Sequence, residues 1–184
     1  FGLDGDASAL SDYTDGGSVS PWAKSAVSAL IDSGFVNGAN GKLNPRSSIT
    51  RAEFAAIAAR FDEHKAAKLA SFTDIYGHWA VSEISLAYEN GWIKGYNDGT
   101  FRPNRNITRA EAMALINRVL NRAPEKPSDL LNNMNKWTDN MDTTKWYYLD
   151  VQEATNSHDY TRKTNNYEMW KKMLADPDWA KYER

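Results

Sequence analysis

The sequence predicts an all-α fold built from three helix–loop–helix repeats. The motif Ile-Thr-Arg-Ala-Glu occurs at residues 49–53 and again at 107–111, and Trp-Ala occurs at 22–23 and again at 79–80. Two segments are therefore related by a shift of 57 to 58 residues. A single helix–loop–helix unit is too small to bury its apolar faces alone, so we expect the repeats to pack together around a common core.

An aromatic-Thr-Asp motif marks the start of each repeat, at 13–15, 72–74 and 137–139. The third copy keeps its first helix, but it lacks the Gly-rich loop and the second Thr-Arg-Ala-Glu motif. From Asp159 onward we expect it to follow another path, with a helix over 167–174. The predicted units, all within one compact body, are an N-terminal tail (1–12), a first repeat (13–61), a second repeat (72–122), a linker (123–136) and a degenerate third repeat (137–184).

The helices are predicted from apolar residues spaced i, i+4 and i+7, as in Ala23, Val27 and Leu30 of the first repeat. This spacing is typical of a helix with one buried face. Thr50 with Glu53, and the equivalent pair 58 residues later, form the Thr-x-x-Glu pattern of a capping box at the start of each second helix. Glycines then supply the left-handed residues that end helices and form turns.

Composition argues against several classes of protein. A net charge of -2 and a pI near 5.9 do not indicate the broad basic face of a nucleic-acid binder. The absence of cysteine excludes disulfides and thiolate metal sites, and no apolar run reaches the length of a membrane span. The first residues lack the basic and apolar regions of a signal peptide, so we expect a segment of a longer protein with passenger domains upstream.

The second repeat resembles the S-layer homology domain, a module that attaches bacterial surface proteins to the cell wall. The resemblance is carried by Phe-Thr-Asp at 72–74, Trp-Ala at 79–80, Gly91 and Gly95, Asp-Gly-Thr-Phe-Arg-Pro at 98–103 and Ile-Thr-Arg-Ala-Glu at 107–111. The first repeat is a good match with a shorter loop, and the third is similar only in its first half.

That resemblance implies a fold, a ligand and a location. The fold is a pseudo-threefold assembly of the three repeats around a central three-helix bundle, with ligand grooves between neighbours. The implied ligand is a secondary cell-wall polysaccharide, often carrying pyruvate ketals, bound without catalysis. The implied location is extracellular, at the bacterial cell wall.

Arg51 and Arg109 are candidate ligand contacts. Each falls at the first helical position, where the helix macrodipole disfavours a positive charge, so helix stability alone does not explain arginine there twice. A helix N-terminus attracts anions, and a guanidinium adds a bidentate fork for a carboxylate or phosphate. We expect loss of either arginine to weaken wall binding with little effect on thermal unfolding. The alternative is an arginine that bridges to an acid of a neighbouring repeat.

Further candidates recur at equivalent positions. An aspartate precedes each first helix by five to seven residues and could accept hydrogen bonds from sugar hydroxyls or simply form a turn. A tryptophan at each helix start could stack on a sugar or pack in the core. The expected binding set, beside the two arginines, is Asp15, Asp74, Asp139, Trp22, Trp79, Trp146 and the loop glycines Gly38 and Gly95.

We expect neither a metal nor a cofactor. His64, His78 and His158 have no ligand spacing between them, and the Asn-Asp-Gly turn of the second repeat lacks the glutamate that closes a calcium loop. The favoured function is a non-catalytic anchor whose partner is a peptidoglycan-linked glycan rather than nucleic acid. Two alternatives stay open: a helical protein-interaction or assembly module, and a glycan-processing enzyme that uses Asp74 or Asp139 as acid or base.

Overall fold

The computed structural model describes residues 5–62, 64–176 and 178. Within this part the chain is mostly helical and includes one small antiparallel sheet. The α-helices are α1 (Lys24–Asp32), α2 (Arg51–Ala59), α3 (Val81–Glu89), α4 (Arg109–Val119) and α5 (Tyr148–Thr155), and the strands are β1 (His158–Arg162) and β2 (Glu168–Met173). Four short 3-10 helices are η1 (Ser8–Asp12), η2 (Gly16–Ser18), η3 (Pro21–Ala23) and η4 (Pro127–Asp129).

Both predicted capping boxes are present. The Thr108 hydroxyl accepts a hydrogen bond from the Glu111 N–H, and the Glu111 carboxylate accepts one from the Thr108 N–H. The first repeat has the same pair at the start of α2. These bonds satisfy backbone donors that a helix start otherwise leaves free, and so fix where α2 and α4 begin.

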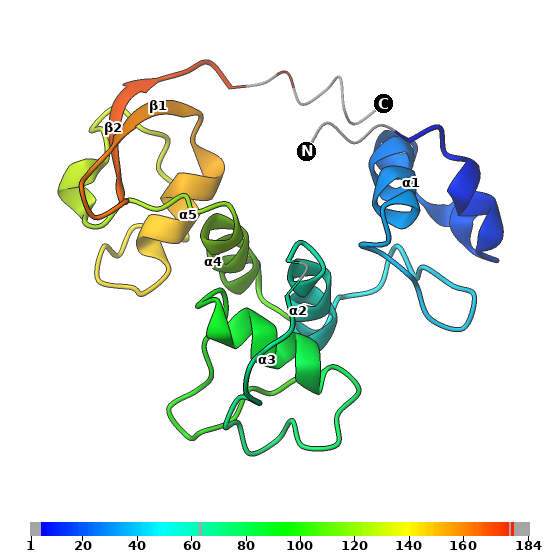
Figure 1. The fold of residues 1–184 in the computed structure, drawn as a ribbon. Helices are drawn as coiled ribbons and strands as arrows, with labels where there is room; N and C mark the ends of the chain where they lie inside the picture. The colour runs from blue at the N-terminus through cyan, green and yellow to red at the C-terminus, as the bar shows by residue number, and fades with distance from the viewer. Residues whose placement is uncertain (1–4, 63, 177, 179–184) are drawn as a thin grey trace.

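The helices pack across the repeat boundary rather than within a repeat. The second helix of the first repeat, α2, packs against α3 of the second repeat, and α4 packs against α5 in the same way. Figure 1 shows α2 and α4 toward the middle of the molecule, with α1 and its 3-10 helices on one side and α5 with the hairpin on the other. Each repeat therefore completes its packing only with the repeat that follows.

Small side chains on α2 permit the close contact with α3. Ala52, Ala55 and Ala58 are buried and belong to one apolar cluster with Ile84 of α3 and Phe101 of the following loop. Full burial of a side chain such as Ile84 or Phe101 stabilises a protein by about 1.5–3 kcal/mol. This cluster holds the loop of the second repeat against both helices.

The prediction of an all-α chain, with a helix over 167–174, is wrong in the last part of the third unit. β1 and β2 form an antiparallel hairpin there, pairing His158 with Met173 and Arg162 with Glu168. Along β2 the buried side chains alternate, because Glu168 and Trp170 are buried and Met169 and Lys171 are exposed. An alternating pattern of this kind belongs to a strand, and a run of only six residues can be mistaken for a helix.

The residues predicted as a linker pack on this hairpin. The Glu168 N–H donates to the Ala123 carbonyl, and Lys163 pairs with Glu125 and with the buried Asp129 of η4. Residues 1–4 of the predicted tail and 179–184 of the predicted third repeat lie outside the described residues. Among the described helices, none combines the length and the apolar character needed to cross a membrane.

Candidate functional site

Two grooves occupy equivalent positions in consecutive repeats. The Trp146 groove has a volume of about 760 Å³ and is lined by residues 92–97, one face of α4, and Trp146 and Tyr147 before α5. The Trp79 groove has a volume of about 560 Å³ and is lined by residues 36–39, one face of α2, and Trp79 before α3. Both volumes are typical of small-ligand sites. Each groove is built mainly by one repeat and closed by a tryptophan of the next, and Arg51 of the first repeat also lines the Trp146 groove.

The three equivalent tryptophans are exposed rather than packed in the core. Their exposed fractions are 56% for Trp22, 60% for Trp79 and 61% for Trp146. Trp79 and Trp146 each line a groove, whereas Trp22 lines neither of these two.

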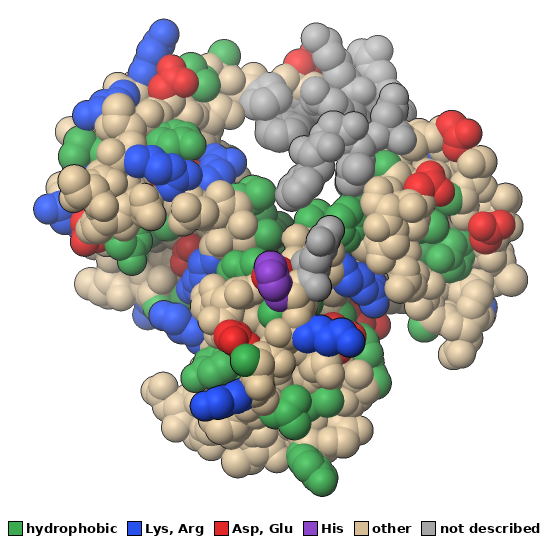
Figure 2. Space-filling view, in the orientation of Figure 1, with side chains coloured by type: hydrophobic (Ala, Val, Ile, Leu, Met, Phe, Trp, Pro, Cys, Tyr) green, Lys and Arg blue, Asp and Glu red, His purple; other side chains and the backbone are tan. Residues whose placement is uncertain are grey.

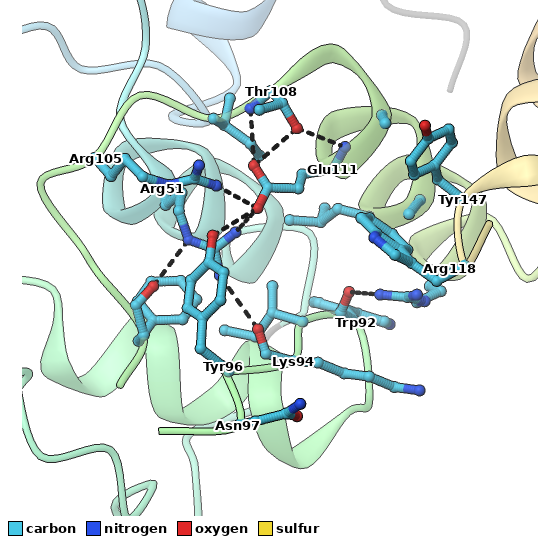
Figure 3. A pocket seen from close by; sticks show the side chains of 18 residues that line it. Arg51, Trp92, Lys94, Tyr96, Asn97, Arg105, Thr108, Glu111, Arg118 and Tyr147 are labelled. Atoms are coloured by element: carbon cyan, nitrogen blue, oxygen red, sulfur yellow. Dashed lines mark hydrogen bonds and ion pairs between the residues drawn. The ribbon is translucent and has the colours of Figure 1, made fainter. Parts of the chain in front are cut away.

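A hydrogen-bond network centred on Glu111 forms one end of the Trp146 groove (Figure 3). One carboxylate oxygen of Glu111 accepts from Arg51, from Arg105 and from the Tyr96 hydroxyl, and the other accepts from Thr108. Burial raises the pKa of Glu111, but the hydrogen bonds from Thr108 and Tyr96 and the charge of Arg51 outweigh it and leave the pKa below its ordinary value. Glu111 is therefore ionised at neutral pH and holds the cations around it.

Positive charge exceeds negative charge among the residues lining the Trp146 groove. The cationic side chains are Arg51, Lys94, Arg105 and Arg118, and the acid is Glu111. The Trp79 groove has fewer cations, namely Lys42 and Arg60, with the acid Glu53. In the view of Figure 2, Lys and Arg side chains lie mainly over the α3, α4, α5 and hairpin region, while the charged side chains seen over α1 are mainly acidic. The Trp146 groove is thus the better site for an anion.

Arg51 is a buried bridge between the first and second repeats. Its Nε donates to the Phe101 carbonyl at 2.8 Å, one terminal nitrogen donates to Glu111 at 2.7 Å, and the other donates to the Lys94 carbonyl at 3.2 Å. The side chain is only 7% exposed. These contacts argue against the expectation that Arg51 contributes little to stability, because the side chain takes the alternative role of bridging to an acid of the next repeat.

Arg109 holds the equivalent position at the start of α4 and has a different environment. It is exposed, and its guanidinium has no hydrogen bond or ion pair with any residue that the structure describes. Arg51 is bound by the loop and helix start of the repeat that follows it. The described part of the third unit lacks that loop and that helix start, and it offers Arg109 no corresponding acceptors.

The predicted aspartates connect the start of a repeat to its own loop. The Asp74 carboxylate accepts from the N–H groups of Phe101 and Arg102, and the Asp15 carboxylate accepts from the equivalent N–H groups of residues 43 and 44. The hydrogen bond from residue 43 is the main cause that lowers the pKa of Asp15. Asp139 is exposed and accepts no hydrogen bond from any residue that the structure describes, because the described part of the third unit has no such loop.

Replacing Asp74 by alanine should lower the free energy of unfolding by about 1.5–3 kcal/mol, the usual contribution of hydrogen bonds to a charged group. The reason is that two backbone N–H groups of the loop lose their acceptor. Asp139→Ala removes the equivalent carboxylate, which accepts no hydrogen bond from a described residue, and should change stability by less than about 0.5 kcal/mol. Urea unfolding followed by circular dichroism measures the stability of both variants. Equal losses of stability would contradict the role of Asp74 as the acceptor for the two loop N–H groups.

The two predicted glycines leave room for an aromatic ring. A Cβ at Gly95 would lie 2.2 Å from Cε1 of Phe72, and a Cβ at Gly38 would lie 2.6 Å from Cε1 of Tyr13. Phe72 and Tyr13 are the aromatic residues of the two aromatic-Thr-Asp motifs. Gly38 also has a φ of 61°, a conformation that favours glycine. Both glycines line a groove through their backbone alone.

Sequence reasoning missed most of the cationic residues of the Trp146 groove: Lys94, Arg105 and Arg118. The sequence did contain a signal for Arg118, because Arg60 occupies the equivalent position of the first repeat. Arg60 donates to the Phe35 carbonyl at 2.6 Å, and Arg118 donates to the Trp92 carbonyl at 3.2 Å. No such repetition marks Arg105, whose equivalent in the first repeat is a serine.

Comparisons with known proteins agree with this repeat structure. Residues 12–55 and 71–113 each match the family model of the S-layer homology domain. A cellulosome-anchoring protein of Acetivibrio thermocellus is 37% identical over 84% of this chain and 35% of its own length. Cell surface glycoprotein 1 of the same organism is 33% identical over 92% of this chain and 7% of its own length.

A third relative extends the comparison to another genus. The surface-layer 125 kDa protein of Lysinibacillus sphaericus is 36% identical over 60% of this chain and 9% of its own length. The chain thus spans about a third or less of the curated relatives described here. The matched segments coincide with the first two repeats, which are therefore S-layer homology domains.

Proposed function

We propose that this chain is a non-catalytic anchoring module that binds an acidic cell-wall polysaccharide in the Trp146 groove. The supporting observation is that one groove of about 760 Å³ combines an exposed tryptophan with four cationic side chains and one acid. An aromatic face packs against the apolar face of a sugar ring, and arginine pairs well with a carboxylate. A sugar bearing an acidic substituent satisfies both requirements.

The setting proposed for this activity is the extracellular face of a bacterial cell wall. The relatives are named as an anchoring protein, a cell surface glycoprotein and a surface-layer protein. Each is much longer than this chain, which leaves room for passenger domains in the same polypeptide. The proposed partner is a glycan linked to peptidoglycan.

We further propose a pseudo-threefold arrangement of the three units, with one of its three grooves incomplete. Support comes from the repeated pairing across boundaries, α2 with α3 and α4 with α5. A complete third repeat would make contact at two places, namely the exposed Trp22 and Arg109, which has no partner among the residues that the structure describes. On this view the Trp146 and Trp79 grooves bind ligand, and the third position does not.

The predicted residues take different parts in this proposal. Trp146 and Trp79 stack on sugar rings, and Arg105 and Arg118 face the acidic group. Arg109 remains a proposed contact for ligand that extends beyond the grooves. The other predicted residues support the grooves: Arg51, Asp15, Asp74, Gly38 and Gly95 hold the loops in place.

Trp146→Ala should weaken binding to purified cell-wall sacculi by about tenfold or more, equivalent to about 1.4 kcal/mol. Trp146 is 61% exposed and lines the groove, so its loss removes a stacking surface with little effect on packing. The matched control is Trp22→Ala, which removes an equally exposed tryptophan outside the two grooves. Co-sedimentation at several protein concentrations gives both affinities, with unfolding curves to confirm that each variant is folded.

The same assay separates the alternative functions. Sacculi stripped of their attached polysaccharide should no longer bind the chain, and sedimentation of the wild type with neither preparation would exclude the anchor. Arg109→Ala should weaken binding less than Trp146→Ala does. Equal losses for Trp146→Ala and Trp22→Ala would favour a protein-interaction surface, and release of reducing sugars would favour an enzyme.

A further inference from the structure

Three ionisable side chains converge inside the third unit, away from both grooves. Glu153 on α5, His158 on β1 and Glu168 on β2 are all buried, and one ligand atom from each lies within 4.8 Å of the others. His158 Nε2 lies 3.5 Å from Glu153 Oε2 and 3.6 Å from Glu168 Oε2. The three residues meet only after the helix and both strands of the hairpin have folded, so their sequence spacing alone does not group them.

The orientation of His158 is fixed by its other ring nitrogen. Nδ1 lies 2.7 Å from the Asn156 carbonyl oxygen, so Nδ1 carries a proton and Nε2 faces the two carboxylates. The Trp170 ring stacks on the imidazole with ring centroids 4.0 Å apart. A histidine that donates one N–H to a backbone carbonyl and presents its other nitrogen is the usual arrangement of a metal-binding histidine.

Several polar atoms of the cluster lack a hydrogen-bond partner among the described residues. His158 Nε2 and both carboxylate oxygens of Glu168 are buried without a hydrogen bond. Glu153 is better satisfied, because Arg122 and the Trp170 indole N–H donate to it. Buried charges of this kind are costly unless they are paired or bind a metal.

We propose that Glu153, His158 and Glu168 bind one divalent transition-metal ion, with Zn²⁺ the best match. One imidazole nitrogen and two carboxylates form a donor set that suits zinc. Two ligands about 2.0–2.1 Å from a tetrahedral zinc ion lie about 3.3 Å apart. The separations of 3.5 and 3.6 Å around His158 Nε2 are close to this value.

The charges around the cluster limit how tightly the ion binds. Arg122 lies 3.0 Å from Glu153 Oε1 and Arg162 lies 3.4 Å from Glu168 Oε1, and both guanidinium groups are partly exposed. They neutralise the outer oxygens and repel a cation. Of the inner oxygens that face His158, Glu168 Oε2 accepts no hydrogen bond and Glu153 Oε2 accepts one from the Trp170 indole. We therefore expect reversible binding that a chelator removes.

Metal binding here would join α5 to the hairpin. Glu153 lies on the same helix whose first turn follows Trp146 and Tyr147, the residues that close the Trp146 groove. The hairpin occupies the place that a second helix takes in the other repeats. The ion would thus stabilise the third unit, and this inference does not depend on what the groove binds.

The test uses the whole chain after removal of metal with EDTA and exchange into chelator-free buffer. Calorimetric titration with Zn²⁺ should give one ion per chain, and Co²⁺ should give the visible absorption bands of a tetrahedral site. Zn²⁺ should also raise the unfolding temperature, because it binds only the folded arrangement. If the folded wild type binds neither ion, the proposal is wrong and the cluster is a metal-free histidine between two carboxylates.

Variants assign the binding to this cluster. His158→Gln and Glu168→Gln should each weaken Zn²⁺ binding by more than about 100-fold. Loss of a residue that only orients a metal ligand weakens binding by up to about 100-fold, and loss of a ligand itself should cost more. His78→Gln removes a histidine of the second repeat and should leave affinity unchanged. If His158→Gln does not fold, Glu168→Gln, which keeps the side-chain shape, decides the question. Equal affinity in wild type and Glu168→Gln would overturn the assignment.

Discussion

Arg51→Ala should lower the free energy of unfolding by about 3–5 kcal/mol, the cost of removing one partner from a buried ion pair. Arg51 is 7% exposed and Glu111 is 13% exposed, so solvent screens the pair little. The change also leaves the Phe101 and Lys94 carbonyls without their donor and removes the cation that lies 4.5 Å from the Phe101 ring centroid. Glu111 would keep its bonds to Tyr96 and Arg105, which reduces the loss.

Arg109→Ala is the matched control, since it changes the same residue type at the same position of the other repeat. Its guanidinium is exposed and unpaired within the described part of the chain, so we expect a change below about 0.5 kcal/mol. Arg51→Lys keeps the charge but loses the three-way fork, and its stability should lie between wild type and Arg51→Ala. Guanidinium unfolding followed by tryptophan fluorescence measures all three, and similar losses at 51 and 109 would contradict the structure.

The contrast between the two arginines follows from how the repeats connect. The first turn of α2 docks on the second repeat, where the Arg51 and Ala52 N–H groups donate to the carbonyls of Arg105 and Pro103. The Ile107 N–H donates back to the Ile49 carbonyl. The α4 start carries the same sequence but is followed by a unit without the accepting loop. Identical motifs therefore serve different roles, according to whether a complete repeat follows.

Local sequence signals predicted the local structure well. The capping boxes of Thr50 and Thr108 depend on residues three apart, and Gly34 and Gly91 take the left-handed conformation expected after α1 and α3. These features need only near neighbours. The hairpin was missed because its strands are short and are stabilised by contacts with α5, such as the bond from Trp170 to a buried glutamate.

The candidate site was predicted only in outline. Repetition identified Trp79 and Trp146, because the same residue recurs where each helix starts, and both line grooves. The direction of the Arg51 side chain could not be predicted, since it depends on carbonyls 43 to 50 residues away. Arg105 could not be identified either, because nothing local shows that it meets Glu111 and Tyr96.

Gly95→Ala should destabilise the protein by about 1–3 kcal/mol, the typical cost of overpacking a core. The new methyl group would lie 2.2 Å from Cε1 and 2.8 Å from Cδ1 of Phe72, and 2.9 Å from the Thr100 carbonyl oxygen. The Phe72 ring cannot easily move aside, because it packs on Tyr88 and Phe101 at centroid distances of 4.9 and 5.6 Å. The backbone at residue 95 must shift instead.

That shift should also weaken polysaccharide binding, because Gly95 lies between Lys94 and Tyr96 in the wall of the Trp146 groove. Gly17→Ala is the control: a Cβ there has no heavy atom within 4 Å, so stability and binding should both stay close to wild type. Unfolding curves and sacculus co-sedimentation, measured at a temperature where Gly95→Ala remains folded, give the two effects separately. A stable Gly95→Ala variant would show that the Phe72 ring does not limit the loop, and the structural role given to this glycine would then be wrong.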